Sequence, residues 1–357
     1  MYNKYMKTAK YPMVSIIIPN YNGEPFIENC LDSLREQSFQ DFEIVVIDDC
    51  SPDNSVDIIK KKYPDVRLFI NNKNSGFDAS VNLGIKNSRG DYLLLLNNDV
   101  VVDSGFVEAL TRSLLTKEKA FSVSSKMIRY YERDTLDDAG DMLHVLGWGF
   151  KRGDGYPTNT HNLPCRVFST CAGAGIYKKS ILNEIGLFDE SFFAYMEDVD
   201  LGYRAMIYGY ENWYEPKAIC YHIGSATTAE GSKYSDFKVR ISARNNVYTV
   251  YKNMPPLQLA FNMPFLIFGF GVKSAYFILK GYGHAYLSGL KEGLLTTKRV
   301  KRVKFKKQNI HNYLKIENML FSGLALHIAY RGYTAIKTQK KRRKTTITHR
   351  KLTGVKS

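Results

Sequence analysis

The chain has 357 residues, a mass of 40.8 kDa and a formal net charge of +15. This length allows one substantial core with an appended segment, and 44% hydrophobic and 13% aromatic residues exclude a disordered chain. Five scattered cysteines without a C-x-x-C pair argue against a zinc or redox site and fit a reducing cytoplasm. Residues 1–10 are polar and lack the apolar stretch of a secretory signal.

The positive charge is concentrated at the C-terminal end. Residues 291–357 contain 19 Lys and Arg against two acids, a net +17, so the other 290 residues sum to −2. A basic end on a nearly neutral body predicts a polyanionic partner, either an anionic membrane surface or nucleic acid. The alternative is a solvated tail, disordered over its last residues.

In chain order, short β-rich runs alternate with amphipathic stretches through the first 100 residues. The pattern predicts strands at 14–19, 43–47, 66–70 and 92–96, and helices at 24–37, 54–62 and 77–87. Such alternation is typical of an α/β fold with a mostly parallel, twisted sheet flanked by helices. Residues 121–170 read as a loop-rich insert that forms an acceptor surface. There is no G-x-G-x-x-G after the first strand and no P-loop motif.

The segment 257–279 is apolar but is interrupted by Asn262, Pro264 and Lys273, which leaves an apolar core of ten residues at 263–272. A membrane span needs about twenty, so we expect this segment to lie in the interface, with the basic stretches 298–307 and 340–344 on lipid head groups. The predicted division is therefore a catalytic domain and an extension. The ranges are 1–250 for the domain, with halves 12–120 and 121–250, and 251–357 for the helical, basic, membrane-associating extension.

Polar side chains gather at the predicted strand ends, where ligands bind in such sheets. Asn97 and Asp99 lie two apart on an extended segment, so oxygens from both can face one Mg²⁺ or Mn²⁺ ion that neutralises a diphosphate. The alternative is an ordinary turn that caps the next helix. Asp49 can accept a hydrogen bond from the imide N–H of uracil or thymine, or simply shape its turn.

Glu197, Asp198 and Asp200 place three carboxylates within four residues beside apolar neighbours, and such crowding raises a pKa toward the range of a general base. Asp198 is the candidate base, although acids also favour a helix N-terminus. Arg204 has the spacing to pair with Asp200. His222 either has a structural role or completes the cation site.

Several segments, in order along the chain, together resemble family 2 glycosyltransferases of the GT-A fold, in particular the rhamnosyltransferase-like branch. They are residues 14–23 (VSIIIPNYNG), 47–51 (IDDCS), 74–84 (NSGFDASVNLG), 95–99 (LLNND), 171–175 (CAGAG) with 186–190 (GLFDE), 195–201 (YMEDVDL), and His222.

The resemblance implies a role for each matching residue. Asp49 would contact the nucleobase, Asp99 and His222 would bind the metal, and Asp198 with Glu197 would be catalytic. The family's D-x-D is Asn97-Asn98-Asp99 here, so the first metal ligand is an amide. The remaining nucleotide-sugar contacts would be Pro19, Asn20, Tyr21, Asn22, Ser51, Asn74, Gly76, Asn82, Asn97, Asn98, Gly173 and Gly175.

The implied function is that of an inverting, metal-dependent transferase on the cytoplasmic face of the membrane, bound peripherally. Its donor would be dTDP-rhamnose or a UDP-hexose, and its acceptor a glycan or lipid-linked hydroxyl in cell-surface polysaccharide synthesis. The Q-x-x-R-W motif of processive synthases is absent, which favours single additions. The alternatives are a non-catalytic sugar- or lipid-binding scaffold, and a nucleic-acid-binding protein, which the acidic strand ends disfavour. The oligomeric state is left unknown.

Overall fold

A computed structural model describes residues 11–224 and 234–353, with side chains up to residue 334. The strands are β1 (Val14–Asn20), β2 (Phe42–Asp48), β3 (Arg67–Ile70), β4 (Tyr92–Leu96), β5 (Val100–Val102), β6 (Ala120–Arg129), β7 (Leu136–Asp138), β8 (Asp141–His144), β9 (Trp148–Lys151), β10 (Cys165–Val167), β11 (Ala174–Lys178) and β12 (Glu211–His222). The α-helices are α1 (Ile27–Arg35), α2 (Ser55–Lys62), α3 (Phe77–Asn87), α4 (Phe106–Thr116), α5 (Lys179–Ile185), α6 (Glu197–Ile207), α7 (Asp236–Asn253), α8 (Pro256–Leu279), α9 (Gly283–Leu295) and α10 (Ile310–Thr353).

One mixed sheet forms the centre of the molecule, with strand order β10-β12-β6-β11-β4-β1-β2-β3. The pairs β1–β2, β1–β4, β2–β3 and β6–β12 are parallel, whereas β11 runs antiparallel between β4 and β6. The predicted mostly parallel α/β sheet with flanking helices is confirmed, including the first four predicted strands and three predicted helices.

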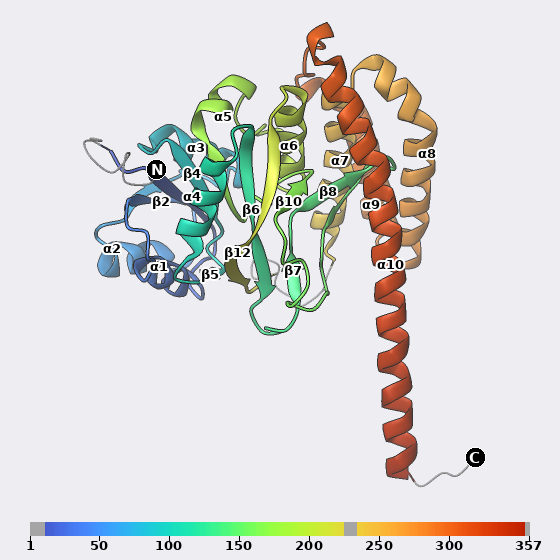
Figure 1. Ribbon diagram of the computed structural model, residues 1–357, viewed down its shortest axis with the longest axis horizontal. Helices are drawn as coiled ribbons and strands as arrows, with labels where there is room; N and C mark the ends of the chain where they lie inside the picture. The colour runs from blue at the N-terminus through green and yellow to red at the C-terminus, as the bar shows by residue number, and fades with distance from the viewer. Residues whose placement is uncertain (1–10, 225–233, 354–357) are drawn as a thin grey trace.

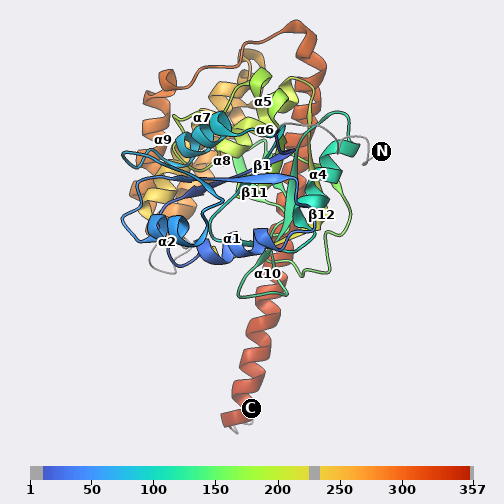
Figure 2. The same cartoon turned by 90° about the vertical axis from the view of Figure 1, so that its left-hand side faces the viewer.

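Both faces of this sheet are buried because its strands are apolar on both sides. Ile16 and Ile18 of β1 pack into a core with α1, α2 and α4, and Ile17 packs on the other face against α3, α5 and α6. The helices lie on either side of the sheet in Figures 1 and 2. Because β1, β2 and β4 run parallel, their carboxyl ends share one edge of the sheet.

The segment 121–170 differs from the loop-rich insert that we predicted. It contains β6 through β10, and its 10-residue strand β6 lies inside the main sheet. The strands after β6 are only 3 or 4 residues long, and glycines at positive φ such as Gly140 and Gly147 punctuate them. Such short strands give little periodicity in sequence, and pairing with distant strands stabilises them.

Helices α7 to α10 stand together beside the sheet, and α10 projects far beyond the rest of the molecule (Figure 1). The predicted boundary at residue 250 falls inside α7, which packs against both α6 and α9. The basic stretch 340–344 lies on α10, where the side chains are outside the described part. Of the residues that we expected to be disordered, 354–357 lie outside the described chain.

Helix α8 is one continuous helix of 24 residues, although three residues interrupt its apolar sequence. Asn262 is buried and hydrogen-bonds Glu317 at 3.0 Å, and Lys273 lines an internal cavity. The interrupting polar groups thus face inward, and the outward face carries exposed Leu257, Phe261 and Ile267. By length and composition α8 is the one helix, among those described, that is apolar enough to cross a membrane.

A buried ionic network joins α6 to α7. Asp200 accepts hydrogen bonds from Arg204 Nε at 3.0 Å, Lys252 Nζ at 2.9 Å and Asn253 Nδ2 at 2.8 Å. Burial by itself raises the pKa of Asp200, but Lys252 and Arg204 lower it below its ordinary value. The predicted Asp200–Arg204 pair is confirmed, and its role is to fix the helix that begins at Glu197.

Candidate active site

The carboxyl ends of β1, β2 and β4 enclose a pocket of about 150 Å³. It is lined by Pro19, Asn20, Tyr21, Asp49, Phe77, Ser80, Asn97, Asn98 and Asp99. Seven of these nine residues are ones that the sequence indicates for donor or metal binding. The parallel strands bring them together because their ends meet at the same edge of the sheet.

Asp49 shapes one wall of this strand-end pocket. Its carboxylate accepts hydrogen bonds from the N–H groups of Ser75 at 2.9 Å and Gly76 at 2.8 Å, and from the Asn71 amide at 2.7 Å. Gly76 has a φ of +90°, and a Cβ there would lie 2.6 Å from the Phe193 ring. Asp49 and Gly76 thus hold the loop before α3 against the segment that leads to α6.

Asn20 and Asn98 join the ends of β1 and β4. Asn98 Nδ2 donates to Asn20 Oδ1 at 2.8 Å, while Asn20 Nδ2 donates to Asp48 at 2.8 Å. Ser51 also binds Asp48, through its N–H at 2.9 Å and its hydroxyl at 2.6 Å, and it accepts from the N–H of Asn22 at 3.2 Å. These side-chain amides hold the pocket wall in place, and both already form hydrogen bonds within the protein.

His222 connects the pocket to the insert. Its Nε2 lies 3.4 Å from Asp99 Oδ2, and its Nδ1 lies 2.8 Å from Asp137 Oδ2, which also pairs with Lys151 at 2.8 Å. Burial lowers the pKa of His222, but the hydrogen bonds to Asp137 and Asp99 raise it to about 9. The Asp137 carboxylate holds Nδ1 of the ring, and the Asp99 carboxylate faces Nε2. This arrangement suits a cation between His222 and Asp99.

The loop 171–173 brings Asp198 to the same place. The N–H of Ala172 hydrogen-bonds the Asp198 carboxylate, and the carbonyl of Gly173, the next residue, accepts from the N–H of Asn97 at 2.9 Å. A Cβ at Gly173 would come within 3.0 Å of the Asn97 amide. Asp198 and Asn97 are therefore hydrogen-bonded to two adjacent residues of this loop, Ala172 and Gly173. Burial raises the pKa of Asp198 above the ordinary value.

Glu197 is buried behind Asp198, and its Oε2 has no hydrogen-bond partner among the described residues. Burial raises its pKa well above the ordinary range, and the nearby carboxyls of Asp78 and Asp198 raise it further. Asp78 on α3 is fully buried, and neither of its oxygens has a partner in the described chain. A carboxyl that is held protonated can donate a hydrogen bond, which an ionised one cannot.

Sequence reasoning missed the acidic residues of the insert. Asp137 contacts His222, and the ligand atoms of Asp138, Asp141 and Cys171 lie within 4.8 Å of one another. Burial raises the pKa of Asp138 to about 7 and that of Asp141 well above its usual range. The D-D-A-G-D pattern at 137–141 is the sequence feature that could have indicated these residues. Because the segment is predicted as a loop, the sequence does not show which way its side chains point.

Seven of the predicted donor contacts lie outside the pocket lining: Ser51, Gly76 and Gly173, which are described above, and Asn22, Asn74, Asn82 and Gly175. Asn82 is buried and bonds the Phe188 backbone at 2.9 and 3.1 Å and Glu190 at 2.9 Å. Gly175 is inside β11, where a Cβ would lie 2.2 Å from Thr170 Cγ2, so packing explains this glycine. Asn74 is exposed on the loop before α3. Asn22 has a φ of +54°, and its backbone N–H donates a hydrogen bond to the Ser51 hydroxyl beside the pocket.

Comparison with known proteins agrees with this geometry. Residues 15–186 match the family model described as "Glycosyl transferase family 2". The uncharacterized glycosyltransferase EpsJ of Bacillus subtilis (strain 168) is 42% identical over 103 residues, which are 28% of this chain and 30% of EpsJ. An uncharacterized glycosyltransferase of Rickettsia typhi (strain ATCC VR-144 / Wilmington) is 30% identical over 205 residues, or 56% of this chain and 60% of the relative.

Among solved structures, that of GalNAc-T7 with UDP, GalNAc and Mn²⁺ superposes with a TM-score of 0.55 at 18% identity, over 69% of this chain and 48% of that one. This likeness concerns the fold alone. The chain spans about a third to three fifths of the length of the two relatives. The family match and the strand-end geometry above show that residues 15–186 form a glycosyltransferase family 2 domain, and the chain has the GT-A fold.

Proposed function

We propose that the protein transfers one sugar from a nucleoside diphosphate donor to an acceptor hydroxyl, with inversion at the anomeric carbon. One observation carries the proposal. Asp99 lines the strand-end pocket together with Asp49 and also lies against His222, so a base-binding wall and a cation site meet at one residue. The Mn²⁺ and UDP in the GalNAc-T7 structure support this combination on the same fold.

The donor set fits a divalent cation. Asp99 offers a carboxylate oxygen and His222 an imidazole nitrogen, and Asn97 lies at the same strand end with an amide oxygen. These are ligands that Mn²⁺ and Mg²⁺ accept in proteins. A cation held there supplies charge neutralisation for the departing diphosphate. His222 Nδ1 faces Asp137, so a cation that took the place of the Nε2 proton would find the Nε2 lone pair on the side of Asp99.

Asp198 is the proposed general base. As the acceptor oxygen forms its bond to the anomeric carbon and the bond from that carbon to the diphosphate oxygen breaks, the hydroxyl proton passes to Asp198. Burial raises the pKa of Asp198, which makes it a better proton acceptor than an exposed aspartate. Glu197, held protonated by its surroundings, is placed to donate a hydrogen bond to a sugar oxygen.

A donor screen tests this proposal. UDP-hexoses and dTDP-rhamnose are offered to the full-length chain with Mn²⁺, with Mg²⁺ or with chelator, and nucleotide release is measured. We expect release with at least one donor, only with metal. If no donor gives release even in a single turnover, the protein is a binding scaffold with this fold. The branch resemblance favours dTDP-rhamnose, and the exposed apolar side of α8 favours a membrane-bound acceptor and a peripheral location on the cytoplasmic face.

Asp137→Asn should weaken the cation site without removing a ligand. Asp137 holds His222 by a 2.8 Å hydrogen bond, and loss of such a supporting carboxylate typically lowers metal affinity by about 10- to 100-fold. The Mn²⁺ concentration for half-maximal activity should rise by that factor, with maximal activity largely restored at saturation. Asp134→Asn, an exposed acid three residues earlier, is the control. An unchanged Mn²⁺ requirement would separate His222 from metal binding.

A further inference from the structure

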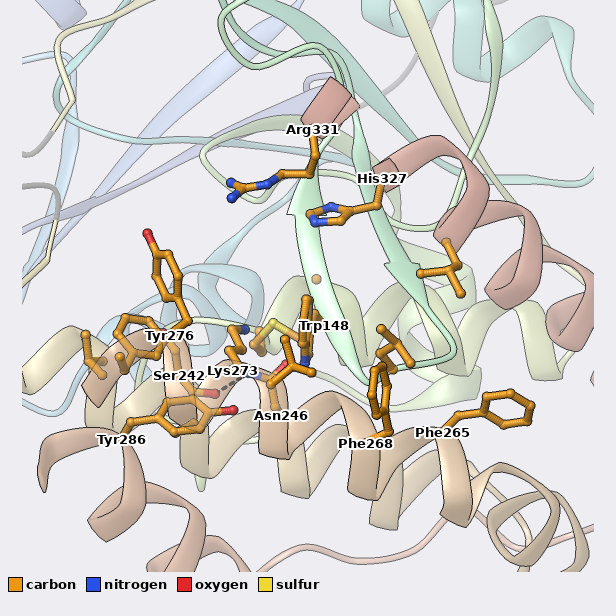
Figure 3. Close-up of a pocket in the computed structure, with 18 of the residues that line it drawn as sticks. Trp148, Ser242, Asn246, Phe265, Phe268, Lys273, Tyr276, Tyr286, His327 and Arg331 are labelled. Carbon is orange, nitrogen blue, oxygen red and sulfur yellow. Dashed lines mark hydrogen bonds between the residues drawn. The ribbon is translucent and has the colours of Figure 1, made fainter. Parts of the chain in front are cut away.

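A cavity of about 1030 Å³ lies between the β8–β9 hairpin and helices α7 to α10 (Figure 3). This volume is at the upper end of the range for small-molecule sites. The strand-end pocket, at about 150 Å³, is far smaller and lies at a different place. Nothing in the donor chemistry described above uses this cavity, so it needs its own explanation.

Most of the cavity wall is apolar. Phe265, Phe268 and Val272 of α8 line it together with Ile328 of α10. Phe268, Val272 and Ile328 are also exposed to the outside, so the lining runs continuously into the apolar outer face of α8. Exposed apolar surface of this kind marks a site for a partner or a membrane. An apolar chain can therefore pass from a lipid layer into the cavity without crossing polar surface.

The inner part of the cavity is polar and positively charged. Lys273 projects into it beside Trp148, with Nζ 5.4 Å from the ring centroid, and no acidic side chain pairs with it in the described chain. Burial lowers the pKa of Lys273 to about 8. Arg331 and His327 approach from α10 in Figure 3. A partly buried cation without a counter-charge is costly, and an anionic ligand would reduce that cost.

Several hydrogen-bonding groups around the cavity also lack a partner among the described residues. They are Trp148 Nε1, Asn246 Oδ1, Tyr286 OH and His327 Nδ1. Asn246 and Tyr286 are only 2% and 1% exposed. The indole N–H can only donate, and the phenol can donate. The indole N–H and the phenol, together with Lys273 and Arg331, form a donor-rich end that suits a phosphate oxygen, whereas Asn246 Oδ1 can only accept, for example from a ligand hydroxyl.

The cavity is linked to the proposed base. Met196, which directly precedes Glu197 and Asp198, lines it, as does Gly149, where a Cβ would lie 3.0 Å from Met196 Sδ. The hairpin spans both sites, since the pair Asp141↔Lys151 stands at the acidic cluster and the pair His144↔Trp148 stands at the cavity. Three residue steps along a strand cover roughly 10 Å. The hairpin and Met196 thus join the cavity to the segment that carries Asp198.

We propose that this cavity binds the acceptor as a lipid phosphate, with its hydrocarbon chain along α8 and α10 and its phosphate at Lys273, Arg331 and Trp148. The inference rests on the proposed function for its role in catalysis, because the hydroxyl of the sugar on that phosphate would be the one presented to Asp198. The binding site itself can be tested without any turnover.

The test uses dodecyl phosphate below its micelle concentration, with dodecanol as the probe that lacks the phosphate. The chain has two tryptophans, so a Trp213→Phe background makes Trp148 the only tryptophan, which is excited selectively at the red edge of the absorption band, away from tyrosine. We expect a saturable fluorescence change with dodecyl phosphate and much weaker binding of dodecanol. Lys273→Met should weaken dodecyl phosphate binding roughly ten- to hundredfold, the effect of losing a charged hydrogen-bond donor. Arg331→Gln, at the exposed rim, should weaken it less.

Lys280→Met is the matched control. Lys280 is exposed at the C-terminal end of α8 and does not line the cavity. Equal affinity for dodecyl phosphate and dodecanol, or an unchanged affinity in both Lys273→Met and Arg331→Gln, would overturn the proposal. Binding to phosphatidylcholine vesicles containing phosphatidylglycerol should be unaffected by Lys273→Met. If no donor is turned over but dodecyl phosphate binds as expected, the proposed function fails and the lipid phosphate site stands.

Discussion

Asp198→Asn should lower turnover by about 10² to 10⁴-fold while donor binding is retained, because general base catalysis contributes an effect of this size. Asparagine has nearly the same shape as aspartate and can still accept the hydrogen bonds from the N–H groups of Ala172 and Val199, the latter at 2.7 Å. The fold of the loop 171–173 should therefore survive. What is lost is the ability to take a proton from the acceptor hydroxyl.

The measurement is the rate of nucleotide release with acceptor present, alongside the dissociation constant of the donor. Asp65→Asn, which changes an exposed surface carboxylate, provides the control for handling and folding. A folded Asp198→Asn variant with turnover close to that of the parent would remove Asp198 from the role of base. Glu197 would then be the remaining carboxyl in the segment, and Glu197→Gln would be the variant to examine.

Asp200→Ala should destabilise the fold by about 3–5 kcal/mol, the cost of breaking a buried ion pair by removing one partner. The substitution leaves Arg204 and Lys252 without the carboxylate that joins them, and both are buried. Each also bonds elsewhere, Arg204 to carbonyls of residues 185–187 and Lys252 to Asp189 at 2.6 Å, which keeps the loss within this range.

Urea unfolding followed by circular dichroism measures this loss, with Asp65→Ala as the exposed counterpart, for which about 0–1 kcal/mol is expected. The network also sets a pH dependence. Since the folded pKa of Asp200 is lowered, its contribution is present above the unfolded pKa of about 3.9 and is lost as the pH falls through the folded value. A loss in Asp200→Ala no larger than in the control would show that the α6–α7 contact does not depend on this carboxylate.

The sequence was sufficient for the nucleotide-binding half of the fold. Runs such as 14–19 and 92–96 are apolar on both faces, and only a strand covered by helices on both sides buries such a run. Their polar ends then fall at one edge of the sheet whatever the loops do. For this reason the sequence alone predicts that Asp49, Asn97 and Asp99 lie near one another, and all three line the strand-end pocket.

The sequence predicts the structure of the insert 121–170 and of the C-terminal extension less accurately, for two different reasons. In 121–170 the strands after β6 are stabilised by partners far away in the chain, so local pattern underestimates them. In α8 the polar residues interrupt the apolar sequence, but in the fold Asn262 and Lys273 face inward and the outer face of the helix stays apolar. Composition along a helix does not tell which side its polar groups occupy until its neighbours are known.

By itself, the sequence determined the family resemblance, the parallel strands and the polar side chains at their ends, because these depend on short motifs and on apolar periodicity. Only the tertiary structure decided which side chains meet. Asp137 holds His222 from 85 residues away, and Lys273 faces Trp148 in a cavity formed by four helices and a hairpin. Contacts between such distant segments follow from how whole elements pack, and packing is a property of surfaces that the linear order of residues does not contain.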